Sequence, residues 1–229
     1  MARVTPPSLR LLVFDWDGTL MDSISTIVAC TQAAVRDLGL EPPADSVVRG
    51  AIGLGLRESM ERFYPAFDDA LFEAMVERYR FHWLESFRDD PLLFAGVIEA
   101  VRHLADQGFL LAVATAKSRR GLERELVRTG LGPLFHATRT VDEAPSKPHP
   151  GMLLGLMEEL GARASETLMI GDTQWDLQMA QNAGTHGLGV LTGSHSREEL
   201  EQCSPVVCLP SVREVPAWLA APVSTPALD

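Results

Sequence analysis

The sequence predicts an α/β protein with a doubly wound, mostly parallel sheet and an inserted α-helical cap domain. Short apolar runs that end in acidic, hydroxyl or glycine turns alternate with helix-like stretches along much of the chain. Between about Met21 and Asp90 the apolar residues follow helical spacing instead. The 229 residues, 46% of them hydrophobic, suffice for such a core and one smaller inserted domain. We therefore expect a core of residues 1–21 and 91–229, a cap of residues 22–90 and a loose tail over residues 220–229.

Two carboxylates follow the first predicted strand directly. Leu9 to Phe14 form a short apolar run, and Asp15 and Asp17 come next, before the turn residue Gly18. Open α/β sheets bind ligands at the carboxyl ends of their strands. Because burying an aspartate is costly, two of them beside a core strand need a metal, a cation or backbone donors as partners. The alternative is that both acids are solvated at the strand end.

A second predicted strand, Phe109 to Ala114, ends at Thr115. A helix-like stretch follows through Arg128, and its first N–H groups can bind an anion. Of the 20 basic residues, only Lys117 and Lys147 are lysines, and an ammonium suits a single phosphate or carboxylate oxygen.

Lys147 is predicted to lie on a stiff loop. Pro148 and Pro150 follow it, and prolines exclude a helix before a new helix near residue 150. A third predicted strand, Thr167 to Ile170, runs into Asp172 and Asp176, which can face one pocket if a helix begins between them. Further elements are predicted at His186 to Leu191 and Val206 to Leu209 (strands) and Val212 to Leu219 (helix).

Right-handed parallel crossovers would bring all these groups to one edge of the sheet. Carboxylates without histidine or cysteine ligands favour a hard cation, most plausibly Mg²⁺. A hydroxyl, a helix amino terminus and a lysine fit a phosphoryl group. The ordered motifs together predict a magnesium and phosphate site at this edge.

These residues resemble the motifs of the haloacid dehalogenase superfamily of aspartate-nucleophile phosphatases. The residues that carry the resemblance are Asp15-Trp16-Asp17-Gly18-Thr19-Leu20, Thr115, Lys147-Pro148 and Gly171-Asp172-Thr173 with Asp176. The resemblance covers about residues 9 to 219 and is greatest to the phosphoglycolate phosphatase and β-phosphoglucomutase type. Trp16 stands where Phe is more usual, and Ala116 stands where the second motif often has Asn, so we expect no side-chain contact to phosphate from residue 116.

The resemblance implies roles for the motif residues. Asp15 would be the nucleophile that forms an aspartyl-phosphate, and Asp17 would be the general acid and base. Mg²⁺ would be held by the side chains of Asp15 and Asp172 and the backbone carbonyl of Asp17. Asp176 would lie next to these ligands without binding the ion itself. The residues expected to contact the phosphate are Gly18, Thr19, Thr115, Ala116 and Lys147.

We expect the predicted cap to determine the substrate specificity. Its helices include one from Phe67 to Phe87. Three glycines interrupt the segment from Arg49 to Arg57, which we expect to be a specificity loop that dips toward the catalytic edge. Arg49 and Arg57 are candidate substrate-binding residues, and the alternative is that both are surface charges.

The resemblance and the motifs together predict a Mg²⁺-dependent phosphatase of a small phosphorylated metabolite, with phosphoglycolate as the leading candidate. A sugar-phosphate mutase and a slow, phosphate-binding regulatory module are the alternatives. The net charge of −11 disfavours nucleic acid as a partner, and no apolar stretch is long enough for a membrane span. Three cysteines, at spacings that fit no zinc site, predict free thiols in a reducing compartment. With no apolar signal region at residues 1–7, we expect a cytoplasmic protein, and we expect a monomer or homodimer. His103, His136 and His195 are interpreted as surface or helix-end residues.

Overall fold

The computed structural model describes residues 9–86 and 93–221 and has a single six-stranded parallel sheet of order β3-β2-β1-β4-β5-β6. The strands are β1 (Leu11–Phe14), β2 (Leu110–Thr115), β3 (Ala137–Thr140), β4 (Thr167–Gly171), β5 (His186–Val190) and β6 (Cys208–Leu209). The chain builds outward from β1 in both directions, so the sheet is doubly wound. The predicted fold class is confirmed.

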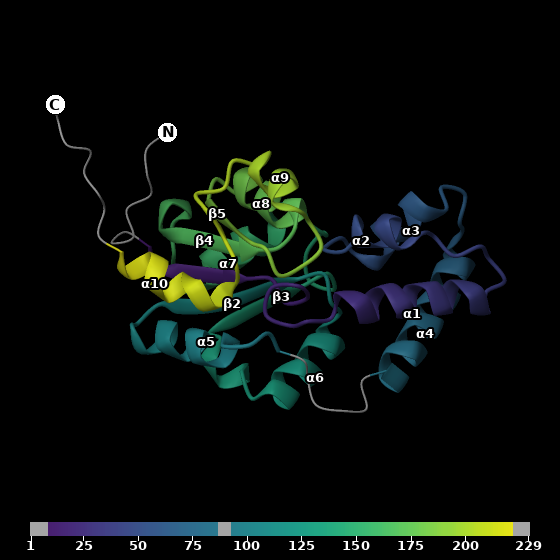
Figure 1. Cartoon of the computed structure of the whole chain (residues 1–229), viewed down its shortest axis with the longest axis horizontal. Helices are drawn as coiled ribbons and strands as arrows, with labels where there is room; N and C mark the ends of the chain where they lie inside the picture. The colour runs from purple at the N-terminus through teal and green to yellow at the C-terminus, as the bar shows by residue number, and fades with distance from the viewer. Residues whose placement is uncertain (1–8, 87–92, 222–229) are drawn as a thin grey trace.

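Helices cover both faces of this sheet (Figure 1). They are α5 (Val97–Asp106), α6 (Arg119–Thr129), α7 (Gly151–Leu160), α8 (Gln174–Asn182), α9 (Arg197–Glu201) and α10 (Val215–Ala220), with short 3-10 turns η2 (Gly132–Leu134), η3 (Ala164–Glu166) and η4 (Val212–Glu214). Side chains alternate along β1 between two buried clusters. Leu12 and Phe14 pack with residues of α5, α6 and α10, whereas Leu11 and Val13 pack with residues of α7 and α8.

Of the five described helices between β1 and β2 in the sequence, the first four stand apart from the sheet (Figure 1). They are α1 (Ile24–Asp37), α2 (Asp45–Arg49), α3 (Leu56–Phe63) and α4 (Asp69–Ser86). We call α1 to α4 and their connections the cap. The cap has its own fully buried cluster of Ala34, Val35, Met60 and Met75. The predicted boundary at 90/91, Phe87 of the predicted helix and residues 222–229 of the predicted tail lie outside the described residues, and the domain limits stay a prediction.

The strand β3 is the main element that the sequence did not indicate. Its residues are Ala-Thr-Arg-Thr, and only Ala137 and Thr140 are buried. The strand lies at the edge of the sheet and pairs only with β2. Arg139 is half-exposed and pairs with Glu159 of α7 at 2.7 Å. A short edge strand with polar side chains carries no apolar run, so its position comes from pairing with β2.

Within the two described ranges, none of the helices combines the length and apolar character that crossing a membrane requires.

Candidate active site

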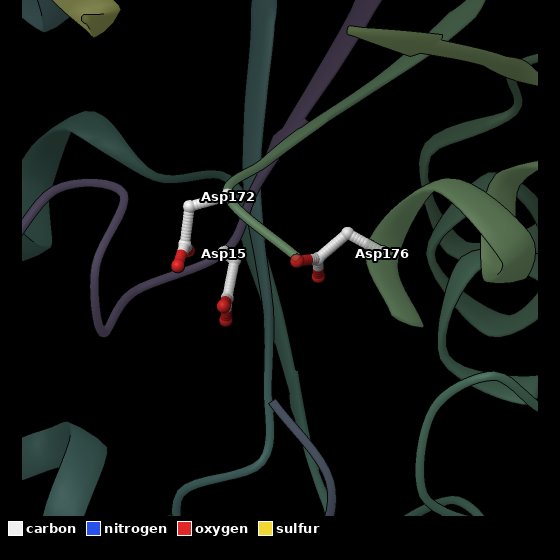
Figure 2. A group of neighbouring side chains, drawn as sticks. All are labelled: Asp15, Asp172 and Asp176. Atoms are coloured by element: carbon white, nitrogen blue, oxygen red, sulfur yellow. The ribbon is translucent and has the colours of Figure 1, made fainter. Parts of the chain in front are cut away.

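The carboxyl ends of neighbouring strands bring the predicted acids together. Phe14 of β1 is in register with Ile170 of β4, so Asp15 and Asp172 leave the sheet side by side. Asp176 is in the first turn of α8, which begins at Gln174, between the two acids of this motif as expected. Figure 2 shows the three carboxyl groups turned toward one region of space. One oxygen from each of the three lies within 4.8 Å of the others.

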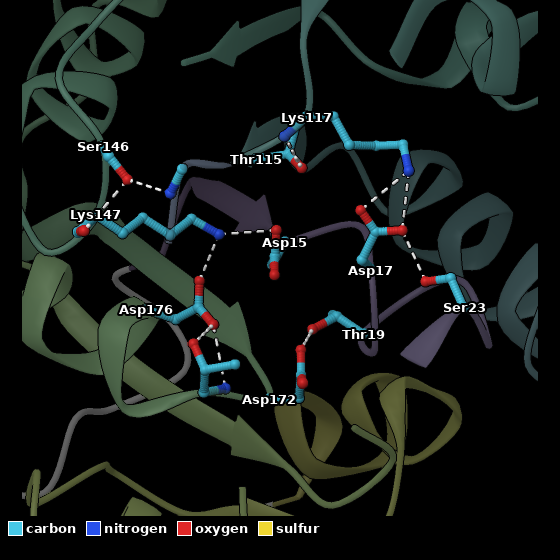
Figure 3. Close-up of polar contacts among 12 residues, drawn as sticks. Asp15, Asp17, Thr19, Ser23, Thr115, Lys117, Ser146, Lys147, Asp172 and Asp176 are labelled. Atoms are coloured by element: carbon cyan, nitrogen blue, oxygen red, sulfur yellow. Dashed lines mark hydrogen bonds and ion pairs between the residues drawn. The ribbon is translucent and has the colours of Figure 1, made fainter. Parts of the chain in front are cut away.

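Lys147 is the buried cation of this edge. Its ammonium lies 2.7 Å from Asp15 Oδ1 and 2.6 Å from Asp176 Oδ1, and its side chain is 0% exposed. Burial alone would lower the pKa of Lys147, but the charges of Asp15 and Asp176 outweigh burial and raise that pKa. The lysine therefore stays charged and links the end of β1 to α8 (Figure 3).

Negative charge is in excess at the site. Three buried carboxylates face one buried ammonium. Burial, aided by the charges of Asp176 and Asp172, raises the pKa of Asp15 well above its ordinary value despite the opposing effect of Lys147. Burial and the charge of Asp176 raise the pKa of Asp172 to about 7. A divalent cation at this place would neutralise the excess charge, so the residues fit the predicted Mg²⁺.

The hydrogen bonds of the three acids differ. Asp176 Oδ2 accepts hydrogen bonds from the backbone N–H (3.1 Å) and hydroxyl (2.7 Å) of Thr173, so both of its oxygens already have partners. Asp15 forms its ion pair with Lys147 through Oδ1 alone. Asp172 accepts one hydrogen bond on each oxygen, from the Thr19 hydroxyl at 2.8 Å and the Ser194 N–H at 2.9 Å. Asp176 is already paired with a cation, whereas Asp15 keeps Oδ2 outside its ion pair with Lys147 and Asp172 makes no ion pair with a described residue. Asp15 and Asp172 are therefore better suited than Asp176 to bind a metal ion directly.

Gly18 and Thr19 form the turn against Asp172. Gly18 has a φ of +84°, and a Cβ there would overlap the Asp172 carboxylate, so only glycine fits this close approach. The buried Thr19 hydroxyl orients the same carboxylate. On the neighbouring strand, Thr115 is buried, and its Oγ1 accepts a hydrogen bond from the backbone N–H of Lys117 at 3.2 Å.

Asp17 is held away from the other acids. Its carboxylate accepts hydrogen bonds from Lys117 Nζ at 2.9 and 3.0 Å and from the Ser23 hydroxyl at 2.6 Å (Figure 3). The Lys117 ammonium also lies 4.2 Å from the ring centroid of Trp83 in α4. The pair therefore connects the end of β1, the start of α6 and the cap. The scarcity of lysine was the signal in the sequence that could have placed Lys117 here.

A cavity of about 710 Å³ opens between this edge and the cap, and Asp15, Asp17 and Thr115 line it. The predicted specificity loop reaches it, because its residues from Ala51 onward line the cavity and the Gly55 N–H donates to the Ser146 hydroxyl at 2.7 Å. Arg57 also lines the cavity, but its guanidinium pairs with Asp69 at 3.0 Å. Arg49, at the end of α2, is not among the lining residues.

The comparisons with known proteins agree with this geometry. The sequence pattern of the haloacid dehalogenase-like hydrolases matches residues 12–190. The chain belongs to this family. Its motifs therefore identify an enzyme of the haloacid dehalogenase type, and the predicted resemblance is confirmed.

Relatives of this hydrolase carry phosphatase names. The chain is 36% identical over 209 residues to the probable phosphatase IndB of Dickeya dadantii, covering 90% of this chain and 91% of that protein. It is 32% identical to the phosphoglycolate phosphatase of Pectobacterium atrosepticum, covering 91% of each chain. The fold is similar to a hydrolase from Pseudomonas syringae, with a TM-score of 0.84, 24% identity and coverage of 92% of this chain and 97% of that one. The hydrolase is thus similar to phosphoric monoester hydrolases of the phosphoglycolate phosphatase type.

Two buried residues of this hydrolase were not indicated by the sequence. Glu125 of α6 is 1% exposed and lines the cavity, and neither of its oxygens accepts a hydrogen bond from any described residue. Burial raises its pKa although Lys117 and Arg128 oppose the shift. His195 is 5% exposed and accepts a hydrogen bond from the Gln174 N–H at 3.0 Å, so it is not a surface residue, but it directly precedes Ser196, the N-cap of α9, as the helix-end alternative predicted. His103 and His136 are exposed, as predicted.

Proposed function

We propose that this hydrolase is a Mg²⁺-dependent phosphatase of a small phosphorylated metabolite similar to phosphoglycolate, and that it works through an aspartyl-phosphate. The observation that carries the proposal is the placement of Lys147 between Asp15 and Asp176, beside a further buried acid, Asp172. This arrangement offers a nucleophile, a fixed positive charge and carboxylates for a cation at one strand edge. The phosphatase names of the relatives support the same reaction class.

In the proposed reaction Asp15 is the nucleophile. Its Oδ2 has no ion pair with Lys147 and would attack phosphorus while the bond to the alcohol oxygen breaks. Lys147 fixes the orientation of Asp15 and adds positive charge near the phosphoryl oxygens. Mg²⁺, held by Asp15, Asp172 and the backbone carbonyl of Asp17, would lower the negative charge on those oxygens. Asp176 would orient Lys147 rather than bind the cation, because its Oδ1 is already paired with that ammonium and its Oδ2 accepts two hydrogen bonds from Thr173.

Asp17 would protonate the leaving alcohol oxygen and then take a proton from the water that hydrolyses the aspartyl-phosphate. Its carboxylate is bonded to Lys117 and Ser23. The proposed role therefore requires Asp17 to turn from Lys117 toward the substrate.

The phosphoryl group would lie beside Thr115 and the backbone N–H of Ala116, near the start of α6. Gly18 allows the turn beside this place, and Thr19 would act mainly through its hydrogen bond to Asp172. Contacts of Arg49 and Arg57 with substrate stay predictions. The cytoplasmic location and a monomeric or homodimeric state also stay predictions. Cys30, Cys203 and Cys208 form no disulfide with one another, which fits a reducing compartment.

Phosphate release from p-nitrophenyl phosphate and from 2-phosphoglycolate, with Mg²⁺ and with a chelator, tests the proposal. We expect release that requires Mg²⁺ and that falls by at least about 10⁴-fold in Asp15→Asn, because an amide is not a nucleophile. The variant should still unfold cooperatively near the wild-type temperature. Turnover that persists in Asp15→Asn would contradict the nucleophile. Transfer of phosphate to an added sugar phosphate would support the mutase, and binding without turnover would support the regulatory module.

A further inference from the structure

The cavity of this hydrolase is lined by cationic side chains that its proposed reaction does not use, together with the carboxyl groups of Asp15, Asp17, Glu58, Glu125 and Asp142. Five cationic side chains line it: Arg57, Arg80, Lys117, Arg120 and Arg124. Arg57 is paired with Asp69, and Lys117 is paired with Asp17. Among the described residues, the other three form no ion pair within 4.0 Å, and all three are exposed. Three arginines at a cavity wall are therefore available to a ligand.

These arginines come from both walls of the cavity. Arg120 and Arg124 are four residues apart on α6, so they lie on the same side of that helix. Arg80 is on α4 of the cap. A ligand group between them would be held by the core and the cap together.

The two α6 arginines differ in their distance from the reacting phosphorus, because Arg120 is the second residue of the helix and Arg124 is the sixth. The helix begins at Arg119, just after Ser118 and close to the proposed phosphoryl site at Thr115. At 1.5 Å of rise per residue, Arg124 lies roughly 8 Å along the helix from its start. The cavity of about 710 Å³ has the size of sites for whole metabolites rather than for a phosphate alone. A substrate can therefore extend from Asp15 toward these side chains.

We propose that Arg80, Arg120 and Arg124 form a subsite for a second anionic group at the end of the substrate that is distant from the reacting phosphate. The inference rests on the proposed phosphatase function and specifies its substrate class. A guanidinium binds a carboxylate or phosphate through charge-assisted and often bidentate hydrogen bonds. The favoured substrate is a phosphorylated metabolite with such a group several carbons from the phosphate, as in a phosphorylated sugar acid. The two-carbon chain of 2-phosphoglycolate would reach this subsite less well.

A matched pair of substrates isolates the second anion. The compounds 6-phosphogluconate and sorbitol 6-phosphate have the same carbon chain and differ in a terminal carboxylate against a terminal hydroxyl. We expect the wild-type enzyme to favour 6-phosphogluconate by roughly ten- to a hundredfold in kcat/KM. The pair fructose 1,6-bisphosphate and fructose 6-phosphate tests a second phosphate in the same way, and the larger of the two ratios identifies the preferred anion.

Substitutions then locate the subsite. The double variant Arg120→Ala/Arg124→Ala should bring the preferred ratio close to one, and Arg80→Ala should reduce it in part. The matched control is Arg102→Ala: this arginine is exposed on α5 and is absent from the cavity lining, so the ratio should keep its wild-type value. Thermal unfolding of each variant should match the wild type, because exposed arginines without ion pairs contribute little to stability.

The outcomes separate this inference from the proposed function. Ratios near one for both substrate pairs in the wild type, or a ratio that the double variant leaves unchanged, would overturn the subsite. Release of phosphate from p-nitrophenyl phosphate in the same preparation would show that the phosphatase proposal survives that result. If Mg²⁺ supports no release from any of the substrates, the proposed function itself fails.

Discussion

The buried acid cluster at the strand ends and the cavity beside it use positive charge in opposite ways. On the sheet side Lys147 is 0% exposed and fixed between Asp15 and Asp176. On the side formed by α6 and the cap, Arg80, Arg120 and Arg124 are exposed, and among the described residues they have no ion pair. A buried charge whose partners are all fixed suits a chemical step that needs one geometry. An exposed side chain without an ion pair can bind an anionic group of the substrate.

Lys117 stands between these two extremes. Its ion pair with Asp17 is partly buried, with side chains 10% and 14% exposed. The same side chain contacts Trp83 of the cap. The comparison suggests that tolerance to substitution should rise from Lys147 to Lys117, and the following predictions test that order.

Lys147→Arg should lower kcat/KM by roughly 10²- to 10³-fold although it keeps the positive charge. A planar guanidinium is larger than an ammonium and cannot hold single oxygens of Asp15 and Asp176 in a fully buried site. Steady-state kinetics with p-nitrophenyl phosphate measures the loss. Circular dichroism and the unfolding temperature show whether the variant is folded, and activity within a fewfold of wild type would mean that this geometry is not required.

Asp172→Asn should stabilise the protein when Mg²⁺ is chelated. Because the pKa of Asp172 rises from 3.8 in the unfolded chain to about 7 in the folded one, the folded state keeps a proton that the unfolded state has lost. The wild-type free energy of unfolding therefore falls as pH rises from about 4 to about 7. The variant lacks this titration, so its advantage should grow by about 1 to 3 kcal/mol between pH 5 and pH 8.

Urea unfolding in chelator at the two pH values measures that difference. Saturating Mg²⁺ should reverse the order, since it binds the ionised Asp172 of the wild type better than an amide. An advantage that is equal at pH 5 and pH 8 would count against the raised pKa and the excess buried charge.

Lys117→Arg should have the smallest effect, within about threefold of the wild-type kcat/KM. Lys117 donates to both oxygens of Asp17, a contact that a guanidinium can reproduce bidentately, and Arg also packs well on the ring of Trp83. Lys117→Met, which removes the charge, is the matched control and should lose more. Equal losses in Lys117→Arg and Lys147→Arg would remove the contrast between the two sites.

Much of the core could be predicted because its signals are local. The runs that became β1, β2 and β4 are apolar except for Thr115 at the end of β2 and Thr167 at the start of β4, since strands covered on both faces need few polar side chains. The acids of β1 and β4 follow their strands within a few residues, so parallel pairing alone brings them to one edge. The edge strand β3 has two buried and two half-buried residues, and its polar sequence gave no such signal.

The sequence by itself determined which chemical groups stand at the strand ends and hence the class of reaction. Only the tertiary structure decided which groups meet. Thr19 bonds to Asp172 across 153 positions, and Lys117 bonds to Asp17 across 100. The burial of Glu125 and the meeting of Arg80 with the α6 arginines at one cavity also depend on how α4 and α6 face each other. Periodicity fixes which face of an element is buried, but it carries no information about the partner that covers it, because that partner comes from a distant part of the chain.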